Sequence, residues 1–243
     1  MRFKLTIEYD GTEYHGWQVQ PNGRTIQAVL QEALTRMTGE SAVVVAAGRT
    51  DAGVHACGQV IGFSLQHTVS PQALQGALNA LTPPDISITA AEVVGDDFHP
   101  RRAARSRIYA YRIWNARWVS PFWRRYAWHV PRELDREQMR AAATHLVGEH
   151  DFTSFQAAGC EARQPVRRVL RSDFDHSGHL ITYTIEATGF LRHMVRNIVG
   201  TLVEVGLGER GVADLPGLLA ARDRTLAGPT APACGLCLQR VNY

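Results

Sequence analysis

The spacing of apolar residues in the first hundred positions predicts alternating strands and helices. Residues 3–9 alternate between polar and apolar, which is typical of a strand with one buried face. Thr25 precedes apolar residues spaced i, i+3, i+4 and i+7, and we expect it to cap a helix that ends at Gly39. We also expect a short buried strand over 42–47, a helix beginning at Ser70 and Pro71, and a strand over 86–94.

The rest of the chain shows the same mixture of periods. Residues 107–113 alternate as a strand does, and Asp135 occupies an N-cap position before a helix that Gly148 would end. Strands are expected over 166–174 and 180–187, followed by a long amphipathic helix over 190–203. The pattern predicts an α+β fold of two similar halves, residues 1–104 and 105–243.

Composition is that of a folded chain. Hydrophobic residues make up 45% of the 243 positions and charged residues 20%, so a sizeable core can be buried. The first ten residues lack the apolar stretch of a signal peptide, and no run of about 18 apolar residues could span a membrane. We therefore expect a cytoplasmic protein whose four cysteines stay reduced.

The net charge of +3 hides a basic middle segment. The net charge is −5 over residues 1–100, +9 over 101–171 and −1 over 172–243. From Arg101 to Arg125 there are eight arginines, six aromatic residues and no acid. Arginine pairs with phosphate and aromatic rings stack on bases, so the segment favours a nucleic-acid partner over a merely solvated basic face.

Two short motifs suggest other chemistry and are rejected. Cys234 and Cys237 have the spacing of a zinc half-site, but the sequence offers no second pair to complete a tetrahedral site, so no metal is expected. Residues 206–211 match G-x-G-x-x-G, yet a predicted helix precedes them where a dinucleotide fold requires a strand. A loop that closes the helix is the better interpretation.

The most unusual string is Gly48-Arg49-Thr50-Asp51-Ala52-Gly53-Val54-His55. Glycines and small residues around one Asp describe a tight loop that can bring a carboxylate close to a substrate. An isolated Asp beside Gly is more often a turn residue, but Arg49 offers a charge partner that would keep Asp51 ionised.

This string resembles the catalytic motif of the tRNA pseudouridine synthase A family. The resemblance continues in the same order along nearly the whole chain. It includes Glu8-Tyr9-Asp10-Gly11, Gly16-Trp17-Gln18, Asp97-Phe98-His99-Pro100-Arg101, Arg107-x-Tyr109-x-Tyr111, His150-Asp151-Phe152, Phe190 to Asn197, and Gly235-Leu236.

The resemblance implies an isomerase that converts uridine to pseudouridine at positions 38, 39 and 40 of the tRNA anticodon arm, without a cofactor. It implies that Asp51 is the nucleophile, attacking C6 or C1′. Tyr109 would pack on the target base and Arg49 would pair with Asp51. It also implies a homodimer, and two halves whose mostly antiparallel sheets join into one large sheet, with helices on one side and a basic active-site cleft between the halves.

Several basic residues are candidates for RNA binding. Arg192 and Arg196 lie four residues apart in the predicted long helix, where an anionic partner would relieve their repulsion, although two solvated arginines fit equally well. The other candidates are Arg101, Arg107, Arg112 and His193, with Arg163 to Arg171 as further phosphate contacts; His193, Asn197 and His55 also suit structural roles. A non-catalytic tRNA-binding module and an RNA hydrolase are the alternatives, but neither accounts for Asp51 beside Arg49.

Overall fold

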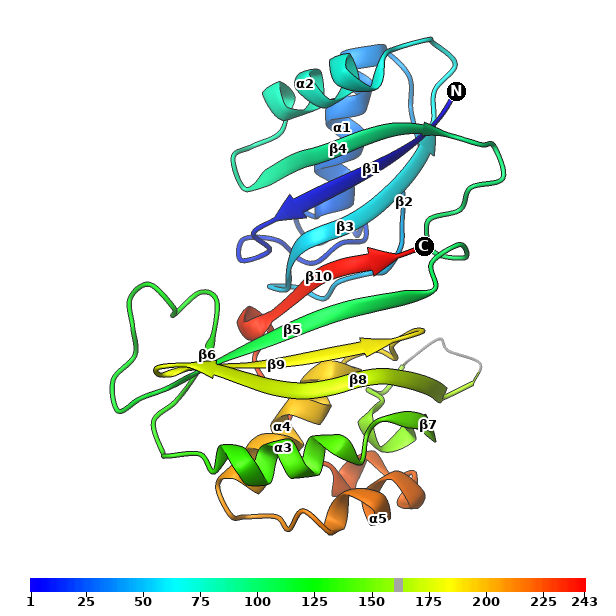
Figure 1. The fold of residues 1–243 in the computed structure, drawn as a ribbon. Coiled ribbons are helices and arrows are strands. Elements are labelled where there is room, and N and C mark those ends of the chain that lie inside the picture. Colours follow the sequence, from blue (N-terminus) through cyan, green and yellow to red (C-terminus); the bar gives the residue numbers. More distant parts are fainter. Residues whose placement is uncertain (160–163) are drawn as a thin grey trace. The chain divides into compact units, whose positions relative to one another are not determined.

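The computed structural model describes residues 1–159 and 164–243, so Cys160 and Arg163 lie outside the described residues. The chain forms two compact units. The first contains Met1–Arg105 together with Cys237–Tyr243, and the second contains Ser106–Leu236. Figure 1 shows the elements of both units along the chain.

The first unit is a mixed sheet with two helices. Strand β1 (Arg2–Tyr9) lies between β3 (His55–Ser64) and β4 (Ile86–Val94) and is antiparallel to both. The short β2 (Val45–Ala46) is antiparallel to β3. On its other side β3 pairs in parallel with β10 (Leu236–Asn242), which brings a strand from beyond the second unit back to the first.

Caps at both ends explain where helix α1 (Ile26–Thr38) begins and ends. The Thr25 hydroxyl accepts the Ala28 N–H at 3.3 Å, and Gly39 adopts a left-handed φ of 74°. Helix α2 (Pro71–Leu81) begins in the same way, with the Ser70 side chain accepting the Ala73 N–H at 3.2 Å. Both helices and both caps confirm the sequence predictions.

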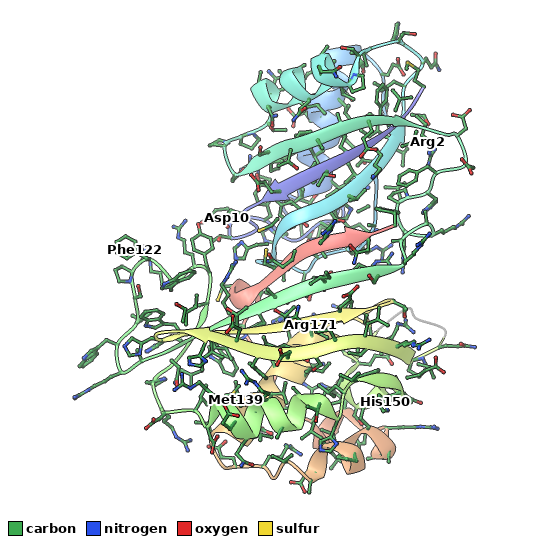
Figure 2. All side chains as sticks on the ribbon, viewed as in Figure 1. Arg2, Asp10, Phe122, Met139, His150 and Arg171 are labelled. Carbon is green, nitrogen blue, oxygen red and sulfur yellow. The ribbon has the colours of Figure 1, made fainter. Side chains whose placement is uncertain are left out.

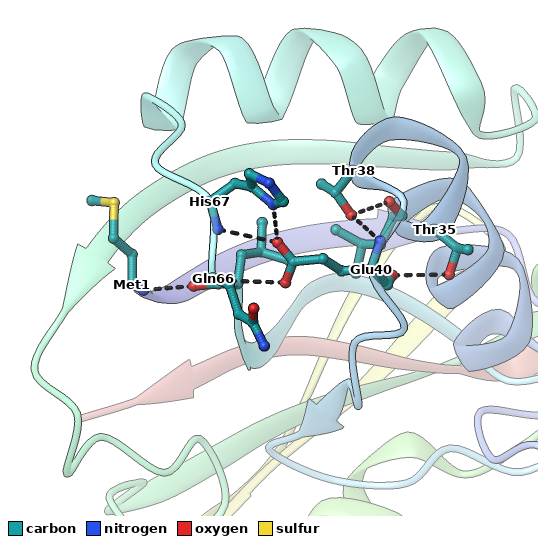
Figure 3. A network of polar contacts seen from close by, with 8 residues as sticks. Met1, Thr35, Thr38, Glu40, Gln66 and His67 are labelled. Atoms are coloured by element: carbon teal, nitrogen blue, oxygen red, sulfur yellow. Dashed lines mark hydrogen bonds and ion pairs between the residues drawn. The ribbon is translucent and has the colours of Figure 1, made fainter.

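A polar network ties the segment after α1 to the segment after β3 (Figure 3). The Glu40 carboxylate accepts the backbone N–H groups of Gln66 at 2.8 Å and His67 at 3.1 Å, and it also contacts His67 Nδ1. The hydrogen bond from Gln66 is the largest cause that lowers the pKa of Glu40 below its ordinary value. The Met1 ammonium group donates to the Leu65 carbonyl at 2.6 Å beside this network.

The second unit contains β5 (Ser106–Asn115), β6 (Trp128–Val130), α3 (Arg136–Thr144), β7 (Gly148–Asp151), β8 (Val166–Ser177), β9 (Leu180–Ala187), α4 (Met194–Gly206) and α5 (Asp214–Ala221). Its main sheet is antiparallel in the order β5, β9, β8, β7, and β6 is parallel to β5. Figure 2 labels Met139 on α3. A Cβ at Gly206 of α4 would come within 2.7 Å of the Met139 sulfur, so the two helices pack closely there.

The structure confirms the α+β class with mostly antiparallel strands and corrects several boundaries. Helix α3 ends at Thr144 rather than at Gly148, which begins β7. Helix α4 begins at Met194 rather than at Phe190, because His193 adopts a left-handed φ of 59°. Strands β3, β6, β7 and β10 and helix α5 were not predicted. Among the described residues, no helix is long and apolar enough to cross a membrane.

Candidate active site

Asp51 lies in a short loop between β2 and β3, residues 47–54, which we call the Asp51 loop. The loop closes on itself through a hydrogen bond from the Val54 N–H to the Asp51 carbonyl at 3.1 Å. Its start is fixed to β3 by the Ala47 N–H, which donates to Val60 O at 2.8 Å. The Asp51 side chain is half-buried, so the carboxylate stays within reach of a substrate.

Three tethers from outside the loop hold its backbone. The Trp17 N–H donates to the Thr50 carbonyl at 3.0 Å, on the residue immediately before Asp51. The Gly53 N–H donates to Tyr14 O at 3.3 Å, and the Gln59 side-chain amide donates to Gly48 O at 2.7 Å. The backbone is therefore fixed on both sides of the carboxylate.

Tyr9 provides a fourth contact through a side chain. Its hydroxyl lies 2.7 Å from the Thr50 hydroxyl, and both residues are buried. Burial raises the pKa of Tyr9 to about 12, so the phenol stays neutral at neutral pH. A neutral hydroxyl can donate or accept here, which lets the pair stay bonded without a buried charge.

Two glycines allow the segment after β1 to approach the Asp51 loop closely. A Cβ at Gly11 would lie 2.0 Å from the Val54 carbonyl oxygen, which is far inside contact distance. Gly16 has a φ of 86°, and a Cβ there would lie 2.8 Å from Thr50 O. Both positions require glycine, one because of space and the other because of conformation as well.

His55 connects the end of β1 to the start of β3. Its Nδ1 lies 3.1 Å from the Gly11 nitrogen and 3.1 Å from the Asp10 Oδ1 atom, and the ring is buried. Figure 2 labels Asp10 at the end of β1. These contacts give His55 a structural role at the edge of the Asp51 loop.

A pocket of about 270 Å³ lies against β2 and Arg49. It brings together two predicted residues, Arg49 and Arg101, which are 52 positions apart in the sequence. Its lining contains Trp17, Gln18, Gln27, Val43, Val44, Val45, Ala46, Arg49, His99 and Arg101. Two guanidinium groups and an indole ring suit a nucleotide, whose phosphate and base they can contact separately.

The sequence predictions selected only Arg49 and Arg101 among the lining residues. Trp17, Gln18 and His99 were not predicted as site residues, although they lie in the motifs Gly16-Trp17-Gln18 and Asp97 to Arg101. Those motifs carry the family resemblance, which is the signal that could have singled them out. The His99 Nδ1 atom accepts the Arg101 N–H at 3.2 Å, so it orders the backbone that carries Arg101.

Tyr109 lies in the second unit, on β5. Its ring is 8% exposed and packs edge-on against Phe190, with 5.0 Å between the ring centroids. Tyr111, two residues along, is fully buried and donates its hydroxyl to Pro232 O at 2.7 Å. Burial raises the pKa of Tyr111 well above its ordinary value. The Tyr111 hydroxyl is therefore committed to the backbone.

The other predicted RNA-binding residues of the second unit have varied surroundings. Arg107 donates to Thr188 O at 2.9 Å and Arg196 to Ala231 O at 2.7 Å, so both support neighbouring backbone. Arg192 is exposed and reaches Ala158 O at 3.3 Å, while Arg112 is half-buried. Because α4 begins at Met194, Arg192 precedes the helix, and the predicted pairing of Arg192 with Arg196 on one helical face is wrong.

The described cysteines are Cys57, Cys234 and Cys237. Among the described residues, no three His, Cys, Asp or Glu side chains are grouped so that they could hold a metal ion. The Cys237 sulfur faces the Cys57 sulfur at 3.4 Å, and the Cys234 sulfur lies 3.7 Å from Ala127 O. Cys234 and Cys237 therefore have separate neighbours.

Comparison with known proteins gives a consistent result over the full chain. The family model described as tRNA pseudouridine synthase matches residues 5–101 and 142–243. A protein of Myxococcus xanthus named tRNA pseudouridine synthase A is 49% identical over 243 residues, covering 100% of this chain and 92% of the relative. A protein of Moorella thermoacetica with the same name is 49% identical over 242 residues, covering 99% and 98%.

Proposed function

The chain belongs to the tRNA pseudouridine synthase family, and from this premise we propose that it acts on uridines 38, 39 and 40 of the tRNA anticodon arm with Asp51 as nucleophile. As a member of the family it is an isomerase that converts uridine to pseudouridine in tRNA. We further propose that it works as a homodimer in the cytoplasm.

The tethering of the Asp51 loop is the observation that carries the assignment of the nucleophile. A carboxylate that adds to C6 of the base or to C1′ of the ribose must be held at a defined position. Three tethers fix the backbone around Asp51, and the Tyr9 hydroxyl holds the side chain of Thr50 beside it. In either case the bond from N1 to C1′ breaks, the base turns and C5 bonds to C1′. Asp51 leaves C1′ as this bond forms if it attacked C1′, or leaves C6 afterwards if it attacked C6. The C5 proton is lost and N1 gains a proton, so the formula of the product equals that of the substrate.

We propose that Arg49 pairs with Asp51 and contacts the RNA. Arg49 lies two positions before Asp51 in the sequence and lines the pocket together with Arg101. In this proposal Arg101, Arg112, Arg192 and His193 contact the tRNA backbone. Arg107 and Arg196 are proposed as further contacts to the tRNA.

Tyr109 is assigned to the target base. Packing against Phe190 fixes its ring, which supports a role in stacking on the uracil and in removing the C5 proton. Tyr109→Phe should therefore abolish turnover of tRNA, while Tyr111→Phe should mainly lower the melting temperature, because it loses the bond to Pro232. Equal turnover in the two variants would remove Tyr109 from the mechanism.

The decisive experiment replaces Asp51 with the isosteric Asn. An unmodified tRNA transcript tritiated at uridine C5 is incubated with each enzyme, and released tritium is counted. Asp51→Asn should release none, yet bind the transcript nearly as tightly as the wild type and melt within a few degrees of it, because phosphate contacts dominate affinity. Tritium release at a tenth of the wild-type rate would overturn the assignment. Mapping the product at positions 38, 39 and 40 tests the proposed sites separately.

A further inference from the structure

The loop between β5 and β6, residues 116–127, exposes three large apolar side chains. We call it the aromatic loop. Phe122 is 84% exposed, Trp118 is 73% exposed and Val119 is 51% exposed. Figure 2 shows Phe122 on the part of the loop that projects away from β5 and β6. Exposed apolar clusters of this kind mark interaction surfaces.

The exposed side chains of the aromatic loop belong to an ordered segment. The Trp114 indole N–H donates to Trp118 O at 2.9 Å, and the Trp114 and Trp123 rings stack with centroids 6.5 Å apart. Inside the loop, the N–H groups of Trp123 and Arg124 donate to Ser120 O at 3.1 and 3.0 Å. The loop therefore presents Trp118 and Phe122 in a defined conformation.

The charge of the aromatic loop selects the kind of partner. Arg117, Arg124 and Arg125 are exposed within it, and no acidic residue lies between Asp97 and Glu133 in the sequence. The Arg117 guanidinium sits 5.0 Å from the Trp118 ring centroid, so cation and ring occupy one surface. In a symmetric contact with a second copy, this basic patch would meet itself and like charges would oppose association. A polyanion that also carries flat rings complements both the arginine charges and the exposed aromatic side chains.

We propose that the aromatic loop docks unpaired nucleotides of the tRNA substrate, a proposal that rests on the function proposed above. Trp118 and Phe122 stack on bases, and the three arginines contact the adjoining phosphates. The aromatic loop is separate from the Asp51 loop in sequence and takes no part in the proposed reaction. Its role is to add affinity for RNA segments whose bases are unpaired.

The test compares Trp118→Leu, which keeps the apolar bulk but loses the flat ring, with Trp118→Phe, which keeps a ring. Binding of an unmodified tRNA transcript to the full chain and steady-state turnover are measured for both. Trp118→Leu should raise Kd and KM about 5- to 150-fold with kcat unchanged, the range expected for loss of one stacked base. Trp118→Phe should stay near the wild type, as should the control Leu226→Ala at another exposed apolar residue.

A second measurement isolates the charge. Arg124→Gln should reduce the slope of log affinity against log salt by about 0.7 to 0.9, while Arg136→Gln on α3 should leave the slope unchanged. Wild-type affinity in Trp118→Leu would overturn the proposal. So would a change of oligomeric state in that variant by light scattering, since the surface would then contact a second copy. Lack of pseudouridine from the wild-type enzyme would instead refute the proposed function, and the affinities would still test the surface.

Discussion

The Asp51 loop and the aromatic loop are both well ordered, but by different means. The Asp51 loop is held by Tyr9, Trp17 and Gln59, which come from elsewhere in the first unit. The part of the aromatic loop that carries Trp118 is held by bonds to the ends of the two strands it joins and among the loop's own residues, and Ala127 at the end of the loop also lies 3.7 Å from the Cys234 sulfur. A nucleophile must be positioned against the rest of a site, whereas a stacking ring needs only a stable and exposed support. Distant substitutions should therefore disturb the first loop and spare the second.

Among the substitutions that test this contrast between the loops, Gly11→Ala has the strongest expected effect. The new Cβ would collide with the Val54 carbonyl, so the Asp51 loop must shift, at a cost of about 1–3 kcal/mol or more in the free energy of unfolding. We expect kcat to fall together with the melting temperature, while the Kd for tRNA stays near the wild-type value. Unfolding by denaturant and steady-state kinetics measure the two effects.

Gly76→Ala is the matched control. Gly76 lies inside α2 with open space around its Cα, so alanine should stabilise the protein by up to about 1 kcal/mol and leave kcat unchanged. If Gly11→Ala retained full kcat, close packing against Val54 would not position Asp51, and the contrast between the two loops would lose its main support.

A smaller effect is expected from Tyr9→Phe, for which Tyr183→Phe in the second unit is the matched control. Each hydroxyl is buried and lies 2.7 Å from another hydroxyl, that of Thr50 for Tyr9 and that of Ser172 for Tyr183. Each variant should lose about 1 kcal/mol of stability. Only Tyr9→Phe should also lower kcat, by between about tenfold and a hundredfold, because only Thr50 adjoins Asp51. Equal kcat values in the two variants would contradict this.

The smallest effect concerns the Glu40 network, which joins two segments by charge rather than by shape. The folded pKa of Glu40 lies below its unfolded value, so its contribution is present above about pH 4.3 and is lost as the pH falls through the folded pKa. The melting temperature of the wild type should therefore decline more steeply between pH 6 and pH 3 than that of Glu40→Gln. Parallel profiles of melting temperature against pH would show that the Glu40 carboxylate does not contribute to stability. Activity at pH 7 should be the same in the wild type and in Glu40→Gln.

Elements with local signals were predictable from the sequence, and elements defined by distant partners were not. Thr25 and Ser70 cap the starts of α1 and α2, and each signal lies in the sequence directly before the helix that it begins. Strand β3 escaped notice because nearly all its positions are buried and it lacks alternation. For α4, Phe190 and Leu191 fit the helical period, but the left-handed backbone at His193 separates them from the helix.

The same distinction applies to the site. The glycines and small residues around Asp51 mark a tight loop in any reading of the sequence, and the family resemblance supplies the role of the carboxylate. The tethers from Tyr9, Trp17 and Gln59 depend on strand register and on a turn more than 30 positions away, so no local pattern predicts them. The sequence placed Trp118 and Phe122 in a basic and aromatic segment that favours nucleic acid, but it did not show which rings of that segment are exposed, since Tyr109 and Tyr111 are buried.

The parallel pairing of β10 with β3 has a consequence for protein synthesis. Cys237–Tyr243 complete the first unit, yet they leave the ribosome only after residues 106–236 have been made. At about 5–20 residues per second, that interval is roughly 7 to 26 s. During it the strand that follows Asp51 keeps an open edge, which is a template for pairing with other chains. The nascent polypeptide thus carries its reactive carboxylate on an unfinished scaffold, and a ribosome that stalls late would yield an aggregation-prone product.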